Sequence, residues 1–125
     1  ANMAFNLSTR PGNLGTKVVE DPAADASGNN DNVLGASGTV FSVFINNTAN
    51  SGNPVYLRLW NHATPTVGTT APNMLLICPA GVSRQYNFGD GVAFGTALSY
   101  ACTTTGADNA NTGPSNSVPI IIIAS

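Results

Sequence analysis

The sequence predicts one all-β domain, an antiparallel β-sandwich of seven or eight strands. No stretch of ten or more residues has apolar residues at helical spacing without an intervening Gly, Pro or Asn. Short runs rich in Val, Ile, Phe, Tyr and Thr recur instead, and Gly, Pro, Asn or Ser residues bound each run. The length of 125 residues suits a single hydrophobic core.

The predicted strands follow one another along the whole chain. The clearest is 55–61, where Tyr56, Arg58 and Trp60 alternate with smaller apolar residues on the other face. The run 82–88 alternates in the same way. The eight predicted strands are 16–20, 38–46, 55–61, 74–78, 82–88, 92–94, 97–103 and 118–124.

Two runs, 40–45 and 120–123, are apolar on both faces. Such a strand is either central in a sandwich or covered by something outside the monomer. Four consecutive isoleucines would promote aggregation unless both edges were paired, so the last run is either the closing strand of a sheet or an intersubunit strand. If the face that carries Ile121 and Ile123 is the core face, Asp at both positions should abolish soluble expression.

Turn signals and polar stretches separate the strands. The sequence Phe-Gly-Asp-Gly-Val at 88–92 predicts a hairpin, because Asp-Gly after an alternating strand is a strong turn signal. The stretches 21–32 and 106–117 are polar and small, and they read as long loops. Long loops in a compact β domain are where contacts to other molecules usually lie.

The N-terminal segment has few large apolar residues, so we predict an arm or loop-rich extension over 1–32 and the sandwich over 33–125. Met3, Phe5 and Leu7 alternate in a way that suits addition of a strand to the sheet edge of an adjacent subunit or partner. These three residues are therefore candidate interface residues.

Charge is scarce: Asp, Glu, Lys and Arg make up 8% of the chain, and the formal net charge is −2. Proteins that bind nucleic acid or anionic membranes need clustered positive charge. We therefore expect neither nucleic acid nor a membrane among the partners. The longest apolar run, 120–124, is too short to span a bilayer and no apolar leader is seen, so we expect a soluble cytosolic product.

The chain has a single histidine, His62, and no acidic residue lies near it in the sequence. Hydrolysis and group transfer need a paired acid and base or an activated nucleophile. We therefore predict no enzyme, no catalytic residue and no cofactor. Asp21, Asp25 and Asp31 offer oxygen ligands, but an EF-hand spacing and its bidentate Glu are missing, which favours an Asx-rich loop over a metal site.

The two cysteines, Cys78 and Cys102, are too few for a disulfide scaffold and lack the spacing of a zinc site. Each shares its face of a predicted strand with large apolar residues, so we expect both to be small buried hydrophobes. A disulfide between them stays open, because the two strands could be neighbours.

Aromatic residues allow two interpretations, a carbohydrate-binding platform or packing in the core and at an interface. The residues concerned are Tyr56, Trp60, Tyr86 and Tyr100. We favour an interface for the strand face that carries Tyr56, Arg58 and Trp60, since Trp, Tyr and Arg are enriched at interface hot spots.

From residue 55 onward the order of motifs resembles a group of small virion proteins of tailed phages, notably cyanophages and other marine phages. The resemblance covers about 70 residues. It rests on YLRLW at 56–60, TPTVGTTAP at 64–72, PAG at 79–81, GVAFGT at 91–96 and TTGAD at 104–108.

The resemblance implies a structural protein of the phage particle with a jelly-roll-like sandwich, assembled in the host cytoplasm and resident in the virion. It implies a capsid cement or decoration protein that binds the major capsid protein, and we expect a homotrimer. The alternative is a tail or fibre module that binds a host receptor or glycan. A cement protein would be present in hundreds of copies per particle and a tail module in a few to dozens.

Overall fold

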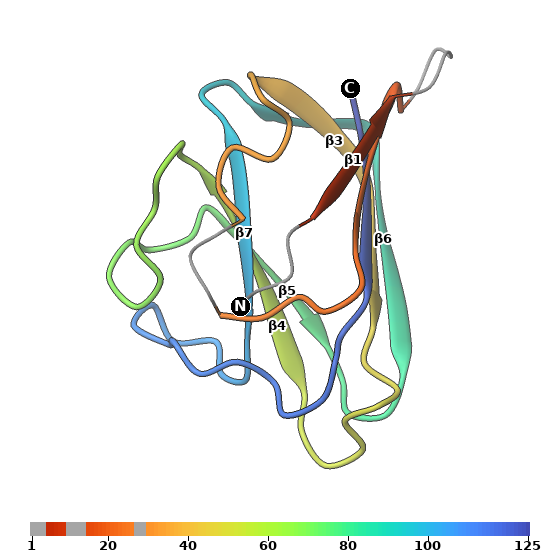
Figure 1. The fold of residues 1–125 in the computed structure, drawn as a ribbon, viewed down its shortest axis with the longest axis vertical. Helices are drawn as coiled ribbons and strands as arrows, with labels where there is room; N and C mark the ends of the chain where they lie inside the picture. Colours follow the sequence, from red (N-terminus) through yellow and green to blue (C-terminus); the bar gives the residue numbers. More distant parts are fainter. Residues whose placement is uncertain (1–4, 10–14, 27–29) are drawn as a thin grey trace.

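The structure, a computed structural model, describes residues 5–9, 15–26 and 30–125. In these residues eight strands form two sheets that pack face to face (Figure 1), which confirms the predicted single-domain antiparallel β-sandwich. The strands are β1 (Asn6–Thr9), β2 (Lys17–Asp21), β3 (Gly38–Asn46), β4 (Val55–Asn61), β5 (Met74–Cys78), β6 (Ser83–Phe94), β7 (Leu98–Thr103) and β8 (Ile120–Ala124).

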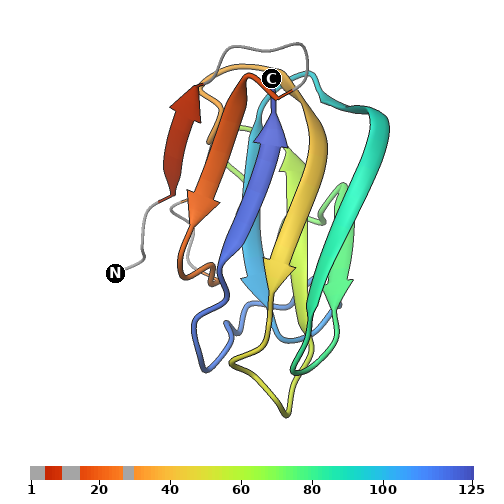
Figure 2. The ribbon, with the colours of Figure 1, turned by 90° about the vertical axis from the view of Figure 1, so that its right-hand side faces the viewer.

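The strand order is that of a jelly roll with one strand of the second sheet missing. The five-stranded sheet runs β1-β2-β8-β3-β6 (Figure 2), and the three-stranded sheet runs β5-β4-β7. In place of the missing strand, residues between β2 and β3 form backbone hydrogen bonds with β7. The N–H groups of Cys102 and Tyr100 donate to the carbonyls of Asp25 (2.8 Å) and Asn30 (3.1 Å), and Val33 N–H donates to Leu98 O (2.8 Å).

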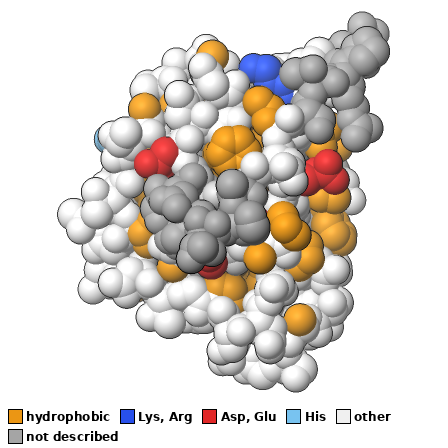
Figure 3. Space-filling model, viewed as in Figure 1, with side chains coloured by type: hydrophobic (Ala, Val, Ile, Leu, Met, Phe, Trp, Pro, Cys, Tyr) orange, Lys and Arg blue, Asp and Glu red, His pale blue; other side chains and the backbone are white. Residues whose placement is uncertain are grey.

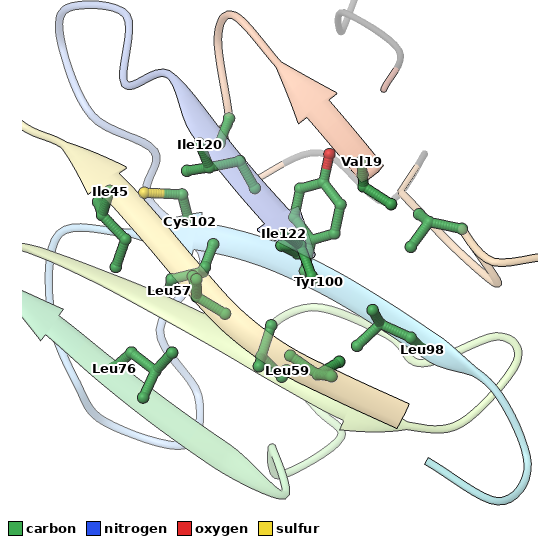
Figure 4. Packing of buried hydrophobic residues seen from close by; sticks show 14 of the residues in the cluster. Val19, Ile45, Leu57, Leu59, Leu76, Leu98, Tyr100, Cys102, Ile120 and Ile122 are labelled. Carbon is green, nitrogen blue, oxygen red and sulfur yellow. The ribbon is translucent and has the colours of Figure 1, made fainter. Parts of the chain in front are cut away.

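The core lies between the two sheets and is apolar. Tyr100 reaches from β7 toward the five-stranded sheet (Figure 4). The residues labelled there from the five-stranded sheet are Val19, Ile45, Ile120 and Ile122, and those from the other sheet are Leu57, Leu59, Leu76, Leu98, Tyr100 and Cys102.

The C-terminal strand β8 lies between β2 and β3 and pairs with both, so it is a closing strand of the sheet. The core face of β8 is the one that does not carry Ile121 and Ile123. Ile120 and Ile122 point into the core, whereas Ile121 and Ile123 are half-buried on the outer face. Register with β2 decides this, because Val19 pairs with Ile122 and both are fully buried.

Part of the expected N-terminal arm belongs to the sandwich. β2 lies inside the five-stranded sheet, and Val19 is fully buried there. β1 pairs with β2 of its own chain, with Leu7 opposite Val19. Phe5 packs against the core and Leu7 is 40% exposed, while Met3 lies outside the described residues. The boundary expected at residue 32 therefore does not separate an arm from the sandwich.

The expected hairpin at 88–92 is also absent, because β6 is one continuous strand. Val40 pairs with Val92 and Ser42 pairs with Asn87, so β6 has three extra residues opposite this part of β3. Gly89 and Gly91 have positive φ angles of 57° and 99°. The two glycines thus provide the left-handed backbone of a bulge, where the sequence pattern had indicated a reversal of the chain.

Candidate functional site

The outer face of the three-stranded sheet is covered by loops of the same chain. The loops 62–73 and 104–119 lie outside this sheet, on the left of Figure 1. Beneath them Arg58 is 0% exposed and Trp60 is 1% exposed. Neither side chain is available at the surface, so our expectation that both form an interface is wrong. The chain itself supplies the cover that we had assigned to a partner.

Arg58 anchors the loop after β7. Its Nε donates to Thr103 Oγ1 at 3.1 Å, and its Nη2 donates to the carbonyl oxygens of Thr105 (3.1 Å) and Ala107 (2.8 Å). Burial lowers the pKa of Arg58, and the charge of Asp108 offsets part of this effect. A buried guanidinium thus holds the backbone of the loop in place through hydrogen bonds to carbonyls.

Trp60 anchors the other loop. Its Nε1 donates to Thr70 O at 3.0 Å, and Thr70 Oγ1 accepts a hydrogen bond from Thr66 N–H at 3.0 Å. Gly68 in this loop has a φ of 91° and lies against Asn111 of the second loop. The motifs at 64–72 and 104–108 therefore form the covering layer of the three-stranded sheet.

Exposed apolar side chains concentrate on β5 and the corner that follows it. Leu75, Ile77 and Val82 are 39%, 37% and 44% exposed. Leu75 pairs with Arg58 and Ile77 pairs with the half-buried Tyr56, so both face outward. We call Tyr56, Leu75 and Ile77 the β5 edge patch.

β5 has less protection than the other described edge strands. β1 has only four residues, β6 has Arg84, Asp90 and a bulge, and hydrogen bonds from segments near β7 cover the edge of that strand. β5 has no charged residue or proline and pairs with β4 without a register shift. An apolar edge strand of this kind is a template for association with another chain.

Neighbouring elements position the β5 edge patch. A Cβ atom built on Gly106 would lie 3.1 Å from the Tyr56 ring and 3.2 Å from Leu75, so this glycine fits closely against both. Asn47 donates from Nδ2 to Pro79 O at 3.1 Å, which fixes the end of β5. On the free side, the Tyr86 hydroxyl donates to Ile77 O at 2.6 Å.

The fold brings an acidic residue near His62, which the sequence had not indicated. Burial raises the pKa of Asp31, and the charge of His62 partly offsets this. His62 Nδ1 accepts a hydrogen bond from Thr64 N–H at 2.9 Å. The Ser99 hydroxyl donates to the His62 carbonyl oxygen at 2.6 Å and not to the imidazole. Asp31, His62 and Ser99 therefore do not form a base-activated nucleophile.

Cys78 and Cys102 are buried free thiols, as expected of small hydrophobes. They are on β5 and β7, with β4 between them. Strands two positions apart are separated by about 10 Å, beyond the Cα separation of about 7 Å that a disulfide allows. Burial raises the pKa of the Cys102 thiol to about 12.

The aromatic residues considered for carbohydrate binding are dispersed. Trp60 and Tyr100 are each 1% exposed, and Tyr56 and Tyr86 are half-buried on different sheets. Among residues 5–9, 15–26 and 30–125, no three His, Cys, Asp or Glu side chains are grouped as a metal site requires. The same part of the chain contains no helix that could cross a membrane.

Leu75 and Ile77 were not among the candidate residues from the sequence. A signal was present, because the run Met-Leu-Leu-Ile-Cys is apolar on both faces and uncharged, like the runs 40–45 and 120–123.

Comparison of the chain with protein families, curated proteins and solved structures found no match.

Proposed function

We propose that this protein is a structural component of a phage particle, a cement or decoration protein that binds and stabilises the lattice of the major capsid protein. The observation that carries the proposal is the apolar, uncharged edge strand β5, with Leu75 and Ile77 exposed beside Tyr56. The resemblance of the motifs at 56–60, 64–72 and 104–108 to small phage virion proteins supports the same function.

The β5 edge patch fits a permanent partner. An apolar edge strand can bind an extended segment through main-chain hydrogen bonds and side-chain burial together, once the segment replaces the Tyr86 hydroxyl at Ile77 O. Charged residues make up 8% of the chain, and a surface poor in charge suits the more apolar interfaces of lasting complexes. Decoration proteins often occupy lattice threefold positions, so we also propose a homotrimer.

The proposal is tested with particles that lack the protein. Leu75→Ser combined with Ile77→Thr should weaken attachment at least about 10-fold, because two apolar anchors are lost from the interface. Val82→Thr is the matched control, since Val82 is 44% exposed but lies outside the β5 edge patch. Denaturant unfolding of both variants verifies that they stay folded.

Two results would overturn the proposal. The first is saturation of particles by the double variant at the wild-type concentration. The second is a copy number of a few to dozens per particle, measured by gel densitometry, which would indicate a tail or fibre module. Hundreds of copies, together with selective loss of binding in the double variant, would support the cement function.

A further inference from the structure

A hollow of about 310 Å³ lies at one end of the five-stranded sheet, away from the β5 edge patch. Asn6 of β1 pairs with Glu20 of β2, and Glu20 pairs with Ile121 of β8, so these three form a row across the outer face. Pro22 and Pro119 complete the apolar walls. On the right of Figure 3, an acidic group (red) lies beside hydrophobic side chains (orange).

Of the two carboxylates at the hollow, only that of Glu20 is without a hydrogen-bond partner among the described residues. Both Asp21 oxygens are engaged, Oδ2 by the Tyr100 hydroxyl at 2.7 Å and Oδ1 by Ala23 N–H at 2.9 Å. Glu20 is exposed, and no described residue forms a hydrogen bond or an ion pair with its carboxylate.

The described cations lie elsewhere. Lys17 donates to Leu34 O, and it is on the opposite face of β2 from Glu20. Arg58 is buried in the other sheet. Arg84 is on β6, three strands from β2. Three strand spacings place it about 14 Å away, which exceeds the screening length of about 8 Å at physiological salt. Within the part of the chain that the structure describes, Glu20 therefore has no neutralising partner.

We propose that this hollow accepts an arginine side chain from a partner protein. The aliphatic stem would pack on Pro22, Pro119 and Ile121, and the guanidinium would meet the Glu20 carboxylate with the Asn6 side chain beside it. One free carboxylate supplies too few oxygens for a hard metal ion, which takes six or more. The volume is at the low end for ligand pockets and suits one side chain.

The partner's identity rests on the proposed function, under which the capsid protein presents the arginine. The hollow itself is tested without particles. Isotope-labelled protein is titrated with Nα-acetyl-arginine amide, which should shift the backbone amide signals of Asn6, Glu20 and Ile121 with a dissociation constant on the order of 1–10 mM. The uncharged citrulline analogue should bind at least 10-fold more weakly.

Glu20→Gln should weaken arginine binding at least 10-fold. Asp90→Asn is the matched control, because it makes the same charge change at an exposed site on β6 and should leave binding unchanged. Equal binding of the citrulline analogue, arginine binding by Glu20→Gln at wild-type affinity, or signal shifts confined to other regions would each overturn the proposal.

Particle binding separates this inference from the proposed function. If Leu75 and Ile77 are needed for attachment but the arginine probe leaves the hollow unaffected, the inference fails and the cement function stands. If the probe binds at Glu20 but the variants of Leu75 and Ile77 attach normally, the proposed function fails and the inference that the hollow binds arginine stands. A change in self-association caused by Glu20→Gln would overturn the assignment to another protein and point to a second copy.

Discussion

The Tyr100 hydroxyl donates a hydrogen bond of 2.7 Å to Asp21 Oδ2 and thereby joins the two sheets of the sandwich. Both residues are 1% exposed, and 79 positions separate them in the sequence. The bond crosses an otherwise apolar core, where a polar group without a partner would be costly. It gives the packing of β2 against β7 a directional contact that apolar side chains do not provide.

Tyr100→Phe should destabilise the protein by about 1–3 kcal/mol, because it leaves a buried Asp21 oxygen without its donor. Denaturant unfolding at pH 7 measures the change. Tyr86→Phe is the control, since it removes a hydroxyl bonded to Ile77 O at an exposed position and should cost less than about 1 kcal/mol. Equal losses in the two variants would contradict a special role for the Tyr100 to Asp21 bond.

Asp21 should make stability depend on pH. Burial raises the pKa of its carboxyl above the ordinary 3.8, and hydrogen bonds from Tyr100 and Ala23 offset only part of this. The folded state therefore holds the proton more tightly, so the free energy of unfolding falls as pH rises from about 3.8 through the raised pKa. Urea unfolding across this range should show a flatter dependence for Asp21→Asn.

Some pH dependence of stability will remain in Asp21→Asn, because burial also raises the pKa of Asp31. An identical slope in the wild type and Asp21→Asn would show that the Asp21 pKa is not raised. Glu20→Gln serves as the control, since Glu20 is the exposed neighbour on the same strand.

Arg58→Ala should reduce stability by about 2–4 kcal/mol, because it removes three hydrogen bonds and leaves a cavity under the loop 104–119. Amide hydrogen exchange in that loop should accelerate as well. Arg84→Ala, which changes an exposed arginine, should stay within about 0.5 kcal/mol of the wild type. Similar effects of both substitutions on stability and exchange would refute the anchoring role.

The faces of β8 predict unequal costs for neighbouring isoleucines. Ile122→Ala should cost about 2–5 kcal/mol, because Ile122 is fully buried between the sheets. Ile121→Ala should cost about 1 kcal/mol or less, since Ile121 is half-buried on the outer face. Thermal and denaturant unfolding of the two variants give the comparison, and a larger loss for Ile121→Ala would contradict the prediction that the Ile122 side of β8 is the core face.

The sequence by itself determined the fold class and the bounds of several strands. The ranges 38–46, 55–61 and 74–78 agree with β3, β4 and β5. These strands were predictable because side-chain alternation and flanking turn residues are local properties. Burial of both cysteines followed from the same alternation.

Only the tertiary structure decided which faces are covered and which edges are free. Arg58 and Trp60 looked like surface residues until the loops 62–73 and 104–119 were seen to cover them. β5 became a candidate site because it lies at a sheet edge, and Glu20 because its row neighbours are Asn6 and Ile121. These relationships depend on strand order and register between distant segments, which local propensity does not encode.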